Sequence, residues 1–505
     1  MSDPAPRRYF GGIRLRFAIA PTGNLVLNAA RVALANALFA QERGARLTLR
    51  IDDLNPERSR PAFADAIIHD LTALGVTWDG ILRQSERLDR YEAAIDALKQ
   101  SGRLYPCFES EAELRAKAEH RRKRGRATIY DRAMLSMTAA QRAAAEAGGK
   151  VPYWRFRLSD GFVVWRDMIL GKRDAKLTAI SDPVLVLANG TVAPVLASVV
   201  DDLDLGITHV IRGEENAADT GVYLDVMTCL KPLLPAMVPS APPPEGGTAT
   251  SPPPLEGGGR GEGASGTGDG GSTLPPAPSL KGRGGTLPRS RTDALAQPPA
   301  TRPLHGGEIP VTGPRFANIP PIDATSSTAR KLGSQALRQT LADGIMPAAL
   351  TAWLTGTEPN PTKPFSLDSM ERVPTSATLL RLNRKVLART DFAAIADRLP
   401  AGATEAFWHA IRADIELLAD AATWWDIVAA DIVPVPSDIG PQALATLPAE
   451  PWDETTWGAW VAVLGPAAKP ALFLALTGEE TGPAMDRLLP LIGRDRVIRR
   501  LRSAA

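Results

Sequence analysis

The sequence predicts an α/β protein with a doubly wound parallel sheet, an inserted α+β region and an all-helical C-terminal part. Strand and helix patterns alternate through residues 13–100, which is typical of a parallel sheet with helices on both faces. Residues 101–190 interrupt the alternation, and from residue 327 onward the apolar pattern is mostly helical. A chain of 505 residues is therefore expected to form two or three domains.

The first half of the chain predicts the elements of this sheet in turn. Gly44 and Gly75 mark helix ends, and Pro61 marks a helix start. The expected elements are strands over residues 13–20 and 47–51 and helices over 27–43 and 61–75. Because ligands of doubly wound sheets bind at the carboxyl ends of the strands, a nucleotide is expected at the loop after the first strand.

The remaining elements follow from the same periodicities. A basic helix is expected over residues 111–126, followed by strands that read VPYWRFRL and GFVVWRDMI. The sheet resumes near Val192, and the segment LLPLIGRDRVIRRL reads as one final helix.

A stretch rich in proline and glycine separates the two halves of the predicted sheet. Of the fifty residues 241–290, ten are Pro and fourteen are Gly, so little apolar surface is available to offset the entropy of ordering. We therefore expect a disordered loop over 239–306. The near-copies PPPEGG, PPPLEGGGRG and PSLKGRG indicate an inserted repetitive element, and a functional linker is the alternative.

Composition excludes several classes of protein. The net charge of +2 is not that of a strongly basic chain, so any nucleic-acid contact must come from local patches. The two cysteines, Cys107 and Cys229, lie far apart, which argues against a disulfide framework and favours a cytoplasmic location. The sequence shows neither the apolar region of a signal peptide nor an apolar run long enough to span a membrane.

The segment RFAIAPTGNLVLNAAR at residues 16–31 is similar to the pattern RFAPSPTGxLHIGxAR. That pattern is typical of the glutamyl-tRNA synthetases, which are class I aminoacyl-tRNA synthetases, and the chain resembles this family. Further similar segments follow in the family order: RIDDLNPERS, QSERLDRYEAA, VVDDLDLGITHVIRGEEN, PRFANIP, LADGIMPAAL and LALTGEETGPAMDRLLPLIGRDRV. The resemblance covers nearly the whole chain outside the Pro/Gly-rich stretch.

The resemblance implies a fold and a reaction. The implied parts are a tail (1–12), a Rossmann-type catalytic domain (13–100 and 191–326), an inserted domain that binds the tRNA acceptor stem (101–190), a stem-contact region (327–374) and a helical anticodon-binding domain (375–505). The implied reaction activates glutamate with ATP, bound with Mg²⁺, to glutamyl-adenylate and then transfers glutamate to tRNA. The implied partners are glutamate and tRNA(Glu) or a related isoacceptor, for a monomer that does not contact a membrane.

The nucleotide-binding signature departs from the family pattern. Family histidines at the helix N-terminus contact the ATP phosphates, and a glycine admits the nucleotide. Here Val26, Leu27 and Asn28 replace the His-Ile-Gly core, and the resemblance assigns ATP binding to Thr22, Gly23 and Asn28. Because losing one preorganised donor typically costs roughly 10² to 10³ in rate, we expect impaired catalysis.

The mobile lysine loop of the family, KLSKR, is also altered. An ungapped alignment of the downstream segment places Arg330 at the second lysine and leaves the first unmatched, whereas a looser alignment keeps Lys331 and loses the second lysine to Ser334. Arg330 and Lys331 are therefore the candidate catalytic cations. An arginine still binds phosphate, although it does not replace lysine equivalently.

The glutamate pocket is changed unevenly. The resemblance assigns glutamate binding to Arg16, Asp52 and Arg212, while the family serine is Ala20 and the family tyrosine is Pro194. Losing polar partners should reduce discrimination between amino acids. The alternative interpretation of the three charged residues is a retained structural ion-pair network.

Other candidate sites are of two kinds. The basic helix carries Arg121, Arg122, Lys123 and Arg124, which form either a tRNA contact or a solvated face. Cys107 and Glu109 stand where zinc-bearing relatives have a CxC pair, so no zinc or other metal site is expected. Asp201 and Asp202 are interpreted as structural.

Three hypotheses for the present function follow. The chain still attaches glutamate to tRNA at a reduced rate, or it is a non-catalytic paralogue that binds tRNA or a protein. In the third hypothesis it is a decaying gene product.

Overall fold

The computed structural model describes residues 12–234, 307–311, 313–322, 333–359, 363–371, 375–432 and 435–504. The loop expected over 239–306 and the candidate cations Arg330 and Lys331 lie outside the described residues, as does the tail before residue 12.

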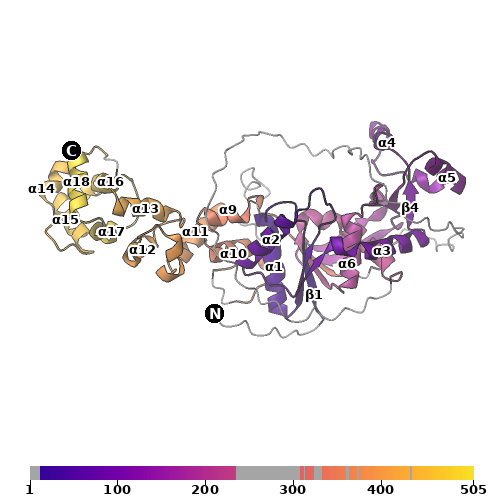
Figure 1. Cartoon of the computed structure of the whole chain (residues 1–505), viewed down its shortest axis with the longest axis horizontal. Coiled ribbons are helices and arrows are strands. Elements are labelled where there is room, and N and C mark those ends of the chain that lie inside the picture. The colour runs from indigo at the N-terminus through magenta and orange to yellow at the C-terminus, as the bar shows by residue number, and fades with distance from the viewer. Residues whose placement is uncertain are drawn as a thin grey trace. The chain divides into compact units, whose positions relative to one another are not determined.

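The main sheet has seven strands in the order β3-β2-β1-β9-β10-β6-β7. Figure 1 shows β1 of this sheet in the part of the molecule that also holds α1 and α6. All neighbouring pairs are parallel except β6 and β7, which are antiparallel. The strands are β1 (Arg14–Ile19), β2 (Arg46–Ile51), β3 (Gly80–Arg83), β6 (Phe162–Asp167), β7 (Gly171–Lys176), β9 (His209–Gly213) and β10 (Arg315–Ile319). This mostly parallel sheet confirms the predicted α/β fold class.

A smaller antiparallel sheet, β4-β5-β8, belongs to the inserted region. Its strands are β4 (Leu104–Cys107), β5 (Tyr153–Phe156) and β8 (Val184–Val186). Strands β6 and β7 also fall between residues 101 and 190, but they extend the main sheet because Phe316 of β10 pairs with Asp167 of β6. The inserted stretch therefore contributes strands to both sheets.

Local sequence signals account for the helices of this half. Helix α1 begins at Leu27 and ends at Arg43, where Gly44 adopts a left-handed φ of 55° that glycine tolerates without strain. The helices are α1 (Leu27–Arg43), α2 (Pro61–Ala73), α3 (Leu88–Gln100), α4 (Glu111–Lys123), α5 (Ala139–Ala147), α6 (Pro194–Asp204) and α7 (Thr220–Leu230). Helix α6, and not a strand, follows Val192, so the expected return to the main sheet near Val192 is wrong: β6 and β7 join that sheet before Val192, and β9 is the next strand of it after α6.

Among the described residues from 333 to 504 all regular elements are helical. They are α9 (Leu337–Ala342), α10 (Pro347–Thr355), α11 (Ser376–Leu387), α12 (Glu405–Ile411), α13 (Asp420–Ala429), α14 (Gly440–Ala445), α15 (Thr456–Leu464), α16 (Lys469–Thr477), α17 (Met485–Ile492) and α18 (Arg494–Ala504). The single final helix expected from LLPLIGRDRVIRRL is wrong. Gly493, with a φ of 80° and a ψ of 152°, separates α17 from α18, since a residue with this positive φ cannot continue a right-handed helix.

Short 3-10 helices complete the described elements: η1 (Gln84–Arg87), η2 (Ala133–Ser136), η3 (Leu177–Ala179), η4 (Glu214–Asp219), η5 (Leu367–Glu371), η6 (Phe392–Ala394), η7 (Ala396–Arg398) and η8 (Pro466–Ala468). No single helix among the described ranges is long and apolar enough to cross a membrane, and only α15 with the following segment Pro466–Thr477, bent by 111°, passes such a test as a pair.

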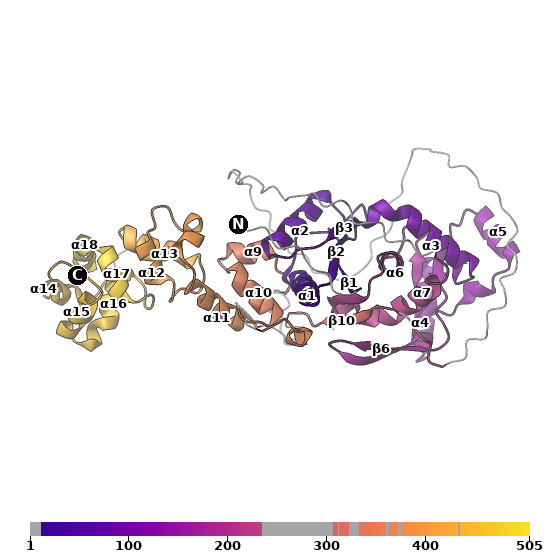
Figure 2. The ribbon, with the colours of Figure 1, turned by 90° about the horizontal axis from the view of Figure 1, so that it is seen from below.

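Helix α1 contacts both strands and helices of the larger apolar core. It packs on β1, β2 and β9 and also against α10 (Figure 2). Arg31 of α1 is 1% exposed and donates from Nη2 to the carbonyl oxygen of Met370 at 2.6 Å. The N-terminal turn of α1 therefore has fixed neighbours on both the sheet and the helical side.

Candidate active site

A cavity of about 300 Å³ opens where β1, β2 and β9 end. Its position agrees with the rule that doubly wound sheets bind ligands at the carboxyl ends of their strands. All three predicted glutamate-binding residues, Arg16, Asp52 and Arg212, line it. The other lining residues are Phe17, Ala18, Ala29, Val32, Arg50, Pro194, Val195, Ser198, Ile211, Gly213, Glu215, Asn216, Asp219 and Tyr223.

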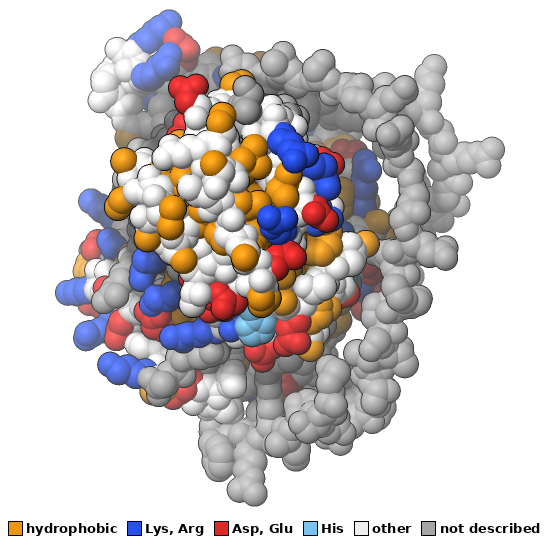
Figure 3. Space-filling model, turned by 90° about the vertical axis from the view of Figure 1, so that its left-hand side faces the viewer, with side chains coloured by type: hydrophobic (Ala, Val, Ile, Leu, Met, Phe, Trp, Pro, Cys, Tyr) orange, Lys and Arg blue, Asp and Glu red, His pale blue; other side chains and the backbone are white. Residues whose placement is uncertain are grey.

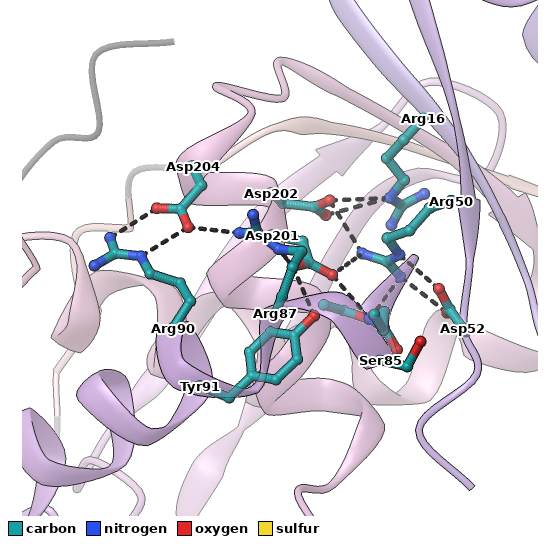
Figure 4. Close-up of polar contacts among 12 residues, drawn as sticks. Arg16, Arg50, Asp52, Ser85, Arg87, Arg90, Tyr91, Asp201, Asp202 and Asp204 are labelled. Atoms are coloured by element: carbon teal, nitrogen blue, oxygen red, sulfur yellow. Dashed lines mark hydrogen bonds and ion pairs between the residues drawn. The ribbon is translucent and has the colours of Figure 1, made fainter. Parts of the chain in front are cut away.

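Asp202 of α6 is the buried anion beneath the cavity. It accepts a hydrogen bond from Nε of Arg16 at 3.1 Å (Figure 4). It also accepts one from the hydroxyl of Tyr223 at 2.6 Å. Burial, followed by the charge of Asp202, holds the pKa of Tyr223 well above its usual value, so Tyr223 stays a neutral donor. Arg16 is thus already paired with a carboxylate.

Arg50 of β2 connects the cavity wall to the same anion. It donates to both carboxylate oxygens of Asp52 at 2.7 and 3.1 Å and to Oγ of Ser198 at 2.8 Å, and its Nη1 lies 3.4 Å from Asp202. Burial alone would lower the pKa of Arg50, but Asp52 and Asp202 outweigh it and raise that pKa. Arg50 is therefore permanently charged and holds Asp52 at the cavity rim.

The network continues away from the cavity through Asp201 and Asp204 (Figure 4). Asp201 accepts from Nε of Arg87 at 2.8 Å and from the hydroxyl of Tyr91 at 2.9 Å. Asp204 pairs with Arg90 at 2.7 Å. These contacts fix α6 against α3, which is the structural role predicted for the aspartates. Among the described residues no group of three or more His, Cys, Asp or Glu side chains is placed to hold a metal ion.

Arg212 of β9 differs from the other arginines of the cavity. Its Nε donates to Oδ1 of Asn318 at 3.1 Å and its Nη2 to Oγ1 of Thr220 at 2.6 Å, and both acceptors are neutral. No ion pair joins Arg212 to a carboxylate of the described chain. Burial, followed by the charge of Arg16, lowers the pKa of Arg212 to about 10. Partial burial of a cation that has no paired anion costs free energy.

The sequence interpretation did not identify Tyr223 and Arg50 of the cavity lining, nor Asn318, which contacts Arg212 from outside the lining. Pro194 stands where the family has a tyrosine, and α7 supplies a different tyrosine, Tyr223, to the cavity lining. Arg50 could have been found, because it is a charged residue inside a strand whose neighbours Leu49 and Ile51 are buried. Asn318 gave no such signal, since its role depends on β10 lying beside β9.

The predicted nucleotide-binding residues are not among those lining the cavity. Asn28 accepts a hydrogen bond at Oδ1 from the backbone N–H of Ile322 at 2.9 Å. A Cβ added to Gly333 would lie 2.7 Å from Nδ2 of Asn28, so the two residues are in close contact. Thr22 is exposed and Gly23 is half-buried in the loop before α1. Asn28 thus ties the first turn of α1 to the segments after β10.

The basic helix α4 has no buried residue. Nη2 of Arg122 and Nζ of Lys123 lie 3.4 and 3.7 Å from Oε1 of Glu119, whereas Arg124 follows the helix as an exposed residue. Such exposed pairs contribute little to stability, which leaves these cations available to a partner.

Lys117 pairs with two carboxylates near Cys107. Nζ of Lys117 lies 2.5 Å from Oε1 of Glu109 and 3.3 Å from Asp131. Burial raises the pKa of the Cys107 thiol to about 11, so it is a neutral thiol at physiological pH. Glu109 therefore has an ammonium partner of its own.

The C-terminal helices present a mixed surface. Figure 3 looks onto this part of the molecule and shows Lys and Arg side chains beside Asp and Glu, with wide uncharged areas between them. A contact with RNA here would rest on shape and on dispersed charges rather than on one basic patch.

A mostly parallel sheet with a cavity at its carboxyl edge, an antiparallel insertion and a helical C-terminal part define a class I aminoacyl-tRNA synthetase. Residues 12–238 match the family of class I tRNA synthetase (E and Q) catalytic domains, and residues 465–505 match an anticodon-binding domain. The chain belongs to the glutamate–tRNA ligase family, as its sequence motifs predicted.

Individual relatives agree with this assignment. The chain is 43% identical to glutamate–tRNA ligase 2 of Gluconacetobacter diazotrophicus, over 98% of this chain and 100% of the relative. It is 41% identical to glutamate–tRNA ligase 2 of Granulibacter bethesdensis, over 97% and 98%. Its fold is similar to the glutamate–tRNA synthetase structure from Elizabethkingia anophelis, with a TM-score of 0.68 at 18% identity over 98% of this chain and 99% of the other.

Proposed function

We propose that the protein attaches glutamate to tRNA with ATP, at a rate lowered by the changes in its nucleotide signature. In the first step an oxygen of the glutamate α-carboxylate attacks the α-phosphorus of ATP, and pyrophosphate leaves. In the second step a terminal ribose hydroxyl of the tRNA attacks the glutamyl carbonyl, and AMP leaves.

The observation that carries the proposal is the unpaired charge of Arg212 at the cavity. The side-chain carboxylate of glutamate supplies the missing anion, and a charge-assisted hydrogen bond is stronger than a neutral one. Arg16 borders the same ligand from β1 while Asp202 holds its guanidinium. Asp52 faces the α-ammonium group, since 23% of its side chain is exposed at the cavity rim.

The remaining partners follow from family membership. ATP, bound with Mg²⁺, lies near Thr22, Gly23 and Asn28, and Arg330 and Lys331 approach its phosphates. Arg121, Arg122, Lys123 and Arg124 contact the acceptor stem of tRNA(Glu) or a related isoacceptor. The protein acts as a monomer in the cytoplasm, where tRNA is charged.

The reduced rate follows from the residues at the N-terminus of α1. Val26 has no donor for the charge that develops on the α-phosphate, and such a donor is typically worth roughly 10² to 10³ in rate. The decisive measurement is tRNA-dependent ATP–pyrophosphate exchange with glutamate. We expect slow but measurable exchange that Val26→His alone does not fully restore. Turnover typical of the family would contradict the reduced rate.

A second candidate is a non-catalytic protein that binds tRNA. The hydrogen bond between Asn28 and Ile322 favours it, because Asn28 occupies the helix turn where the family has glycine. If the protein binds tRNA in a salt-sensitive way but shows no ATP–pyrophosphate exchange, this candidate is favoured over the first.

A further inference from the structure

We propose that Asn318 and Asp167 form a positioning pair that presents Arg212 to the carboxylate of the ligand with its charge unneutralised. This inference rests on the proposed function for the identity of the ligand, glutamate. It assigns a role to two residues that lie outside the cavity lining and act through Arg212.

The pair is built across two strand contacts. Asn318 of β10 is the register partner of Arg212 in β9, and Asp167 ends the neighbouring strand β6. Both Asn318 and Asp167 are 1% exposed. The side chain of Asn318 accepts from Nε of Arg212 at 3.1 Å and donates from Nδ2 to Oδ2 of Asp167 at 2.5 Å. The amide therefore stands between the carboxylate and the guanidinium.

Asp167 fixes the orientation of that amide. A carboxylate only accepts hydrogen bonds, so the NH₂ group of Asn318 must face Asp167 and the oxygen must face Arg212. The opposite orientation would place NH₂ against a guanidinium N–H and oxygen against oxygen. Asp167 is itself held, since its Oδ1 accepts from the backbone N–H groups of Ile169 and Leu170, both at 2.9 Å.

A neutral hydrogen-bond acceptor orients a cation without neutralising its charge. Asn318 and Thr220 provide two such acceptors. Their hydrogen bonds fix the orientation of the Arg212 guanidinium but do not supply an anion. The groups that act on Arg212 include Arg16, Tyr223, Asp202 and the exposed Asp219, and the exposed Glu215 also lines the cavity. Asp202 is already engaged by Arg16 and Tyr223. The ligand carboxylate is therefore the anion that completes the site, and an uncharged carboxamide would not.

The test exchanges the two side chains in the variant Asn318→Asp/Asp167→Asn. This exchange keeps the net charge and every hydrogen bond, because the amide introduced in place of Asp167 keeps an oxygen for the backbone donors and donates to the new carboxylate. The negative charge moves from one strand to the next and lies against Arg212. We expect calorimetric affinity for L-glutamate to fall at least about tenfold, while the melting temperature without ligand rises by about 2 to 4 °C.

Two further arms make the outcome decisive. In an Arg212→Met background the exchange should lose its gain in melting temperature, because the cation that the carboxylate would pair with is gone. Unchanged glutamate affinity in the exchange variant overturns the proposal. If the wild-type protein binds no glutamate, the proposed function is wrong. The melting temperatures without ligand still test the role of the Asn318–Asp167 pair in that case, because an exchange variant no more stable than wild type would overturn the proposed pair.

Discussion

The side-chain oxygen of Asn28 accepts a hydrogen bond from the backbone N–H of Ile322 at 2.9 Å. This contact joins the first turn of α1 to the chain that follows β10. The adjacent backbone is paired as well, because the N–H of Leu27 donates to the carbonyl of Gln335 at 3.1 Å. The family pattern has a glycine at the position of Asn28, and the proposed function has the nucleotide approach this turn.

Replacing Asn28 by glycine should therefore lower the stability of the fold but lower the KM for ATP. The lost hydrogen bond and the added backbone freedom should lower the free energy of unfolding by about 1 to 2 kcal/mol. The removed side chain should lower the KM for ATP severalfold in pyrophosphate exchange. Asn28→Ala is the matched control, since it loses the same hydrogen bond but keeps a Cβ. Equal KM values for the two variants would contradict the steric explanation.

Removing the charge of Arg212 should stabilise the fold and abolish glutamate binding. The pKa of Arg212 is lowered to about 10 in the folded protein, so the unfolded chain holds this proton more tightly. The resulting penalty is fully present below pH 10 and disappears only as pH rises towards the usual value of 12.5. Arg212→Met should gain about 1 kcal/mol, equally at pH 6 and pH 8, in urea unfolding.

Arg16→Met is the control for that experiment, because it removes a cation from the same cavity. Arg16 is paired with Asp202, so its loss should destabilise the protein. If both substitutions changed the free energy of unfolding in the same direction, pairing with a carboxylate would not distinguish Arg16 from Arg212.

Neutralising Asp202 should be strongly destabilising. Its carboxylate serves Arg16, Arg50 and the hydroxyl of Tyr223, and Asp202→Asn leaves the buried Arg16 without its anion, whereas Arg50 keeps Asp52. Breaking such a buried pair typically costs about 3 to 5 kcal/mol. Asp219→Asn changes an exposed carboxylate of the cavity rim and should shift urea unfolding very little. Similar midpoints for both variants would refute the assigned role of Asp202.

Deleting residues 239–306 should leave the fold intact. Their composition provides little apolar surface for a core, and closing a shorter loop is not unfavourable. Thermal unfolding of the shortened chain should match that of the full chain. A midpoint many degrees lower would mean that this stretch packs against the remainder.

Binding of tRNA should outlast catalysis and fall steeply with salt. Phosphate contacts add incrementally to affinity, whereas a missing donor at the α-phosphate acts multiplicatively on rate. Reversing the charges of Arg121, Arg122, Lys123 and Arg124 should weaken binding and reduce its salt dependence. Reversing the exposed Lys172, Arg173 and Lys176 of β7 is the control. An equal loss in the control would point to a general charge effect instead of an α4 contact.

The sequence alone determined the family, the fold class and the elements with strong local signals. Helix α1 has the predicted bounds because its apolar face repeats every three to four residues and Gly44 can adopt a positive φ. The final helix was predicted wrongly, since the same periodicity continues across Gly493 while the backbone does not. Periodicity reports which face is buried, not where the chain turns.

The tertiary structure alone decided which charges are neutralised. Arg16, Arg50 and Arg212 look equivalent in the sequence, but only the first two face carboxylates brought by α6 and the end of β2. Arg212 faces an amide because β10 lies beside β9 and Asp167 orients that amide. The pairings of Arg16 with Asp202, of Arg212 with Asn318 and of Asn318 with Asp167 join residues more than a hundred positions apart, and electrostatic energy depends on distance in space and on burial. Neither quantity is encoded in local sequence.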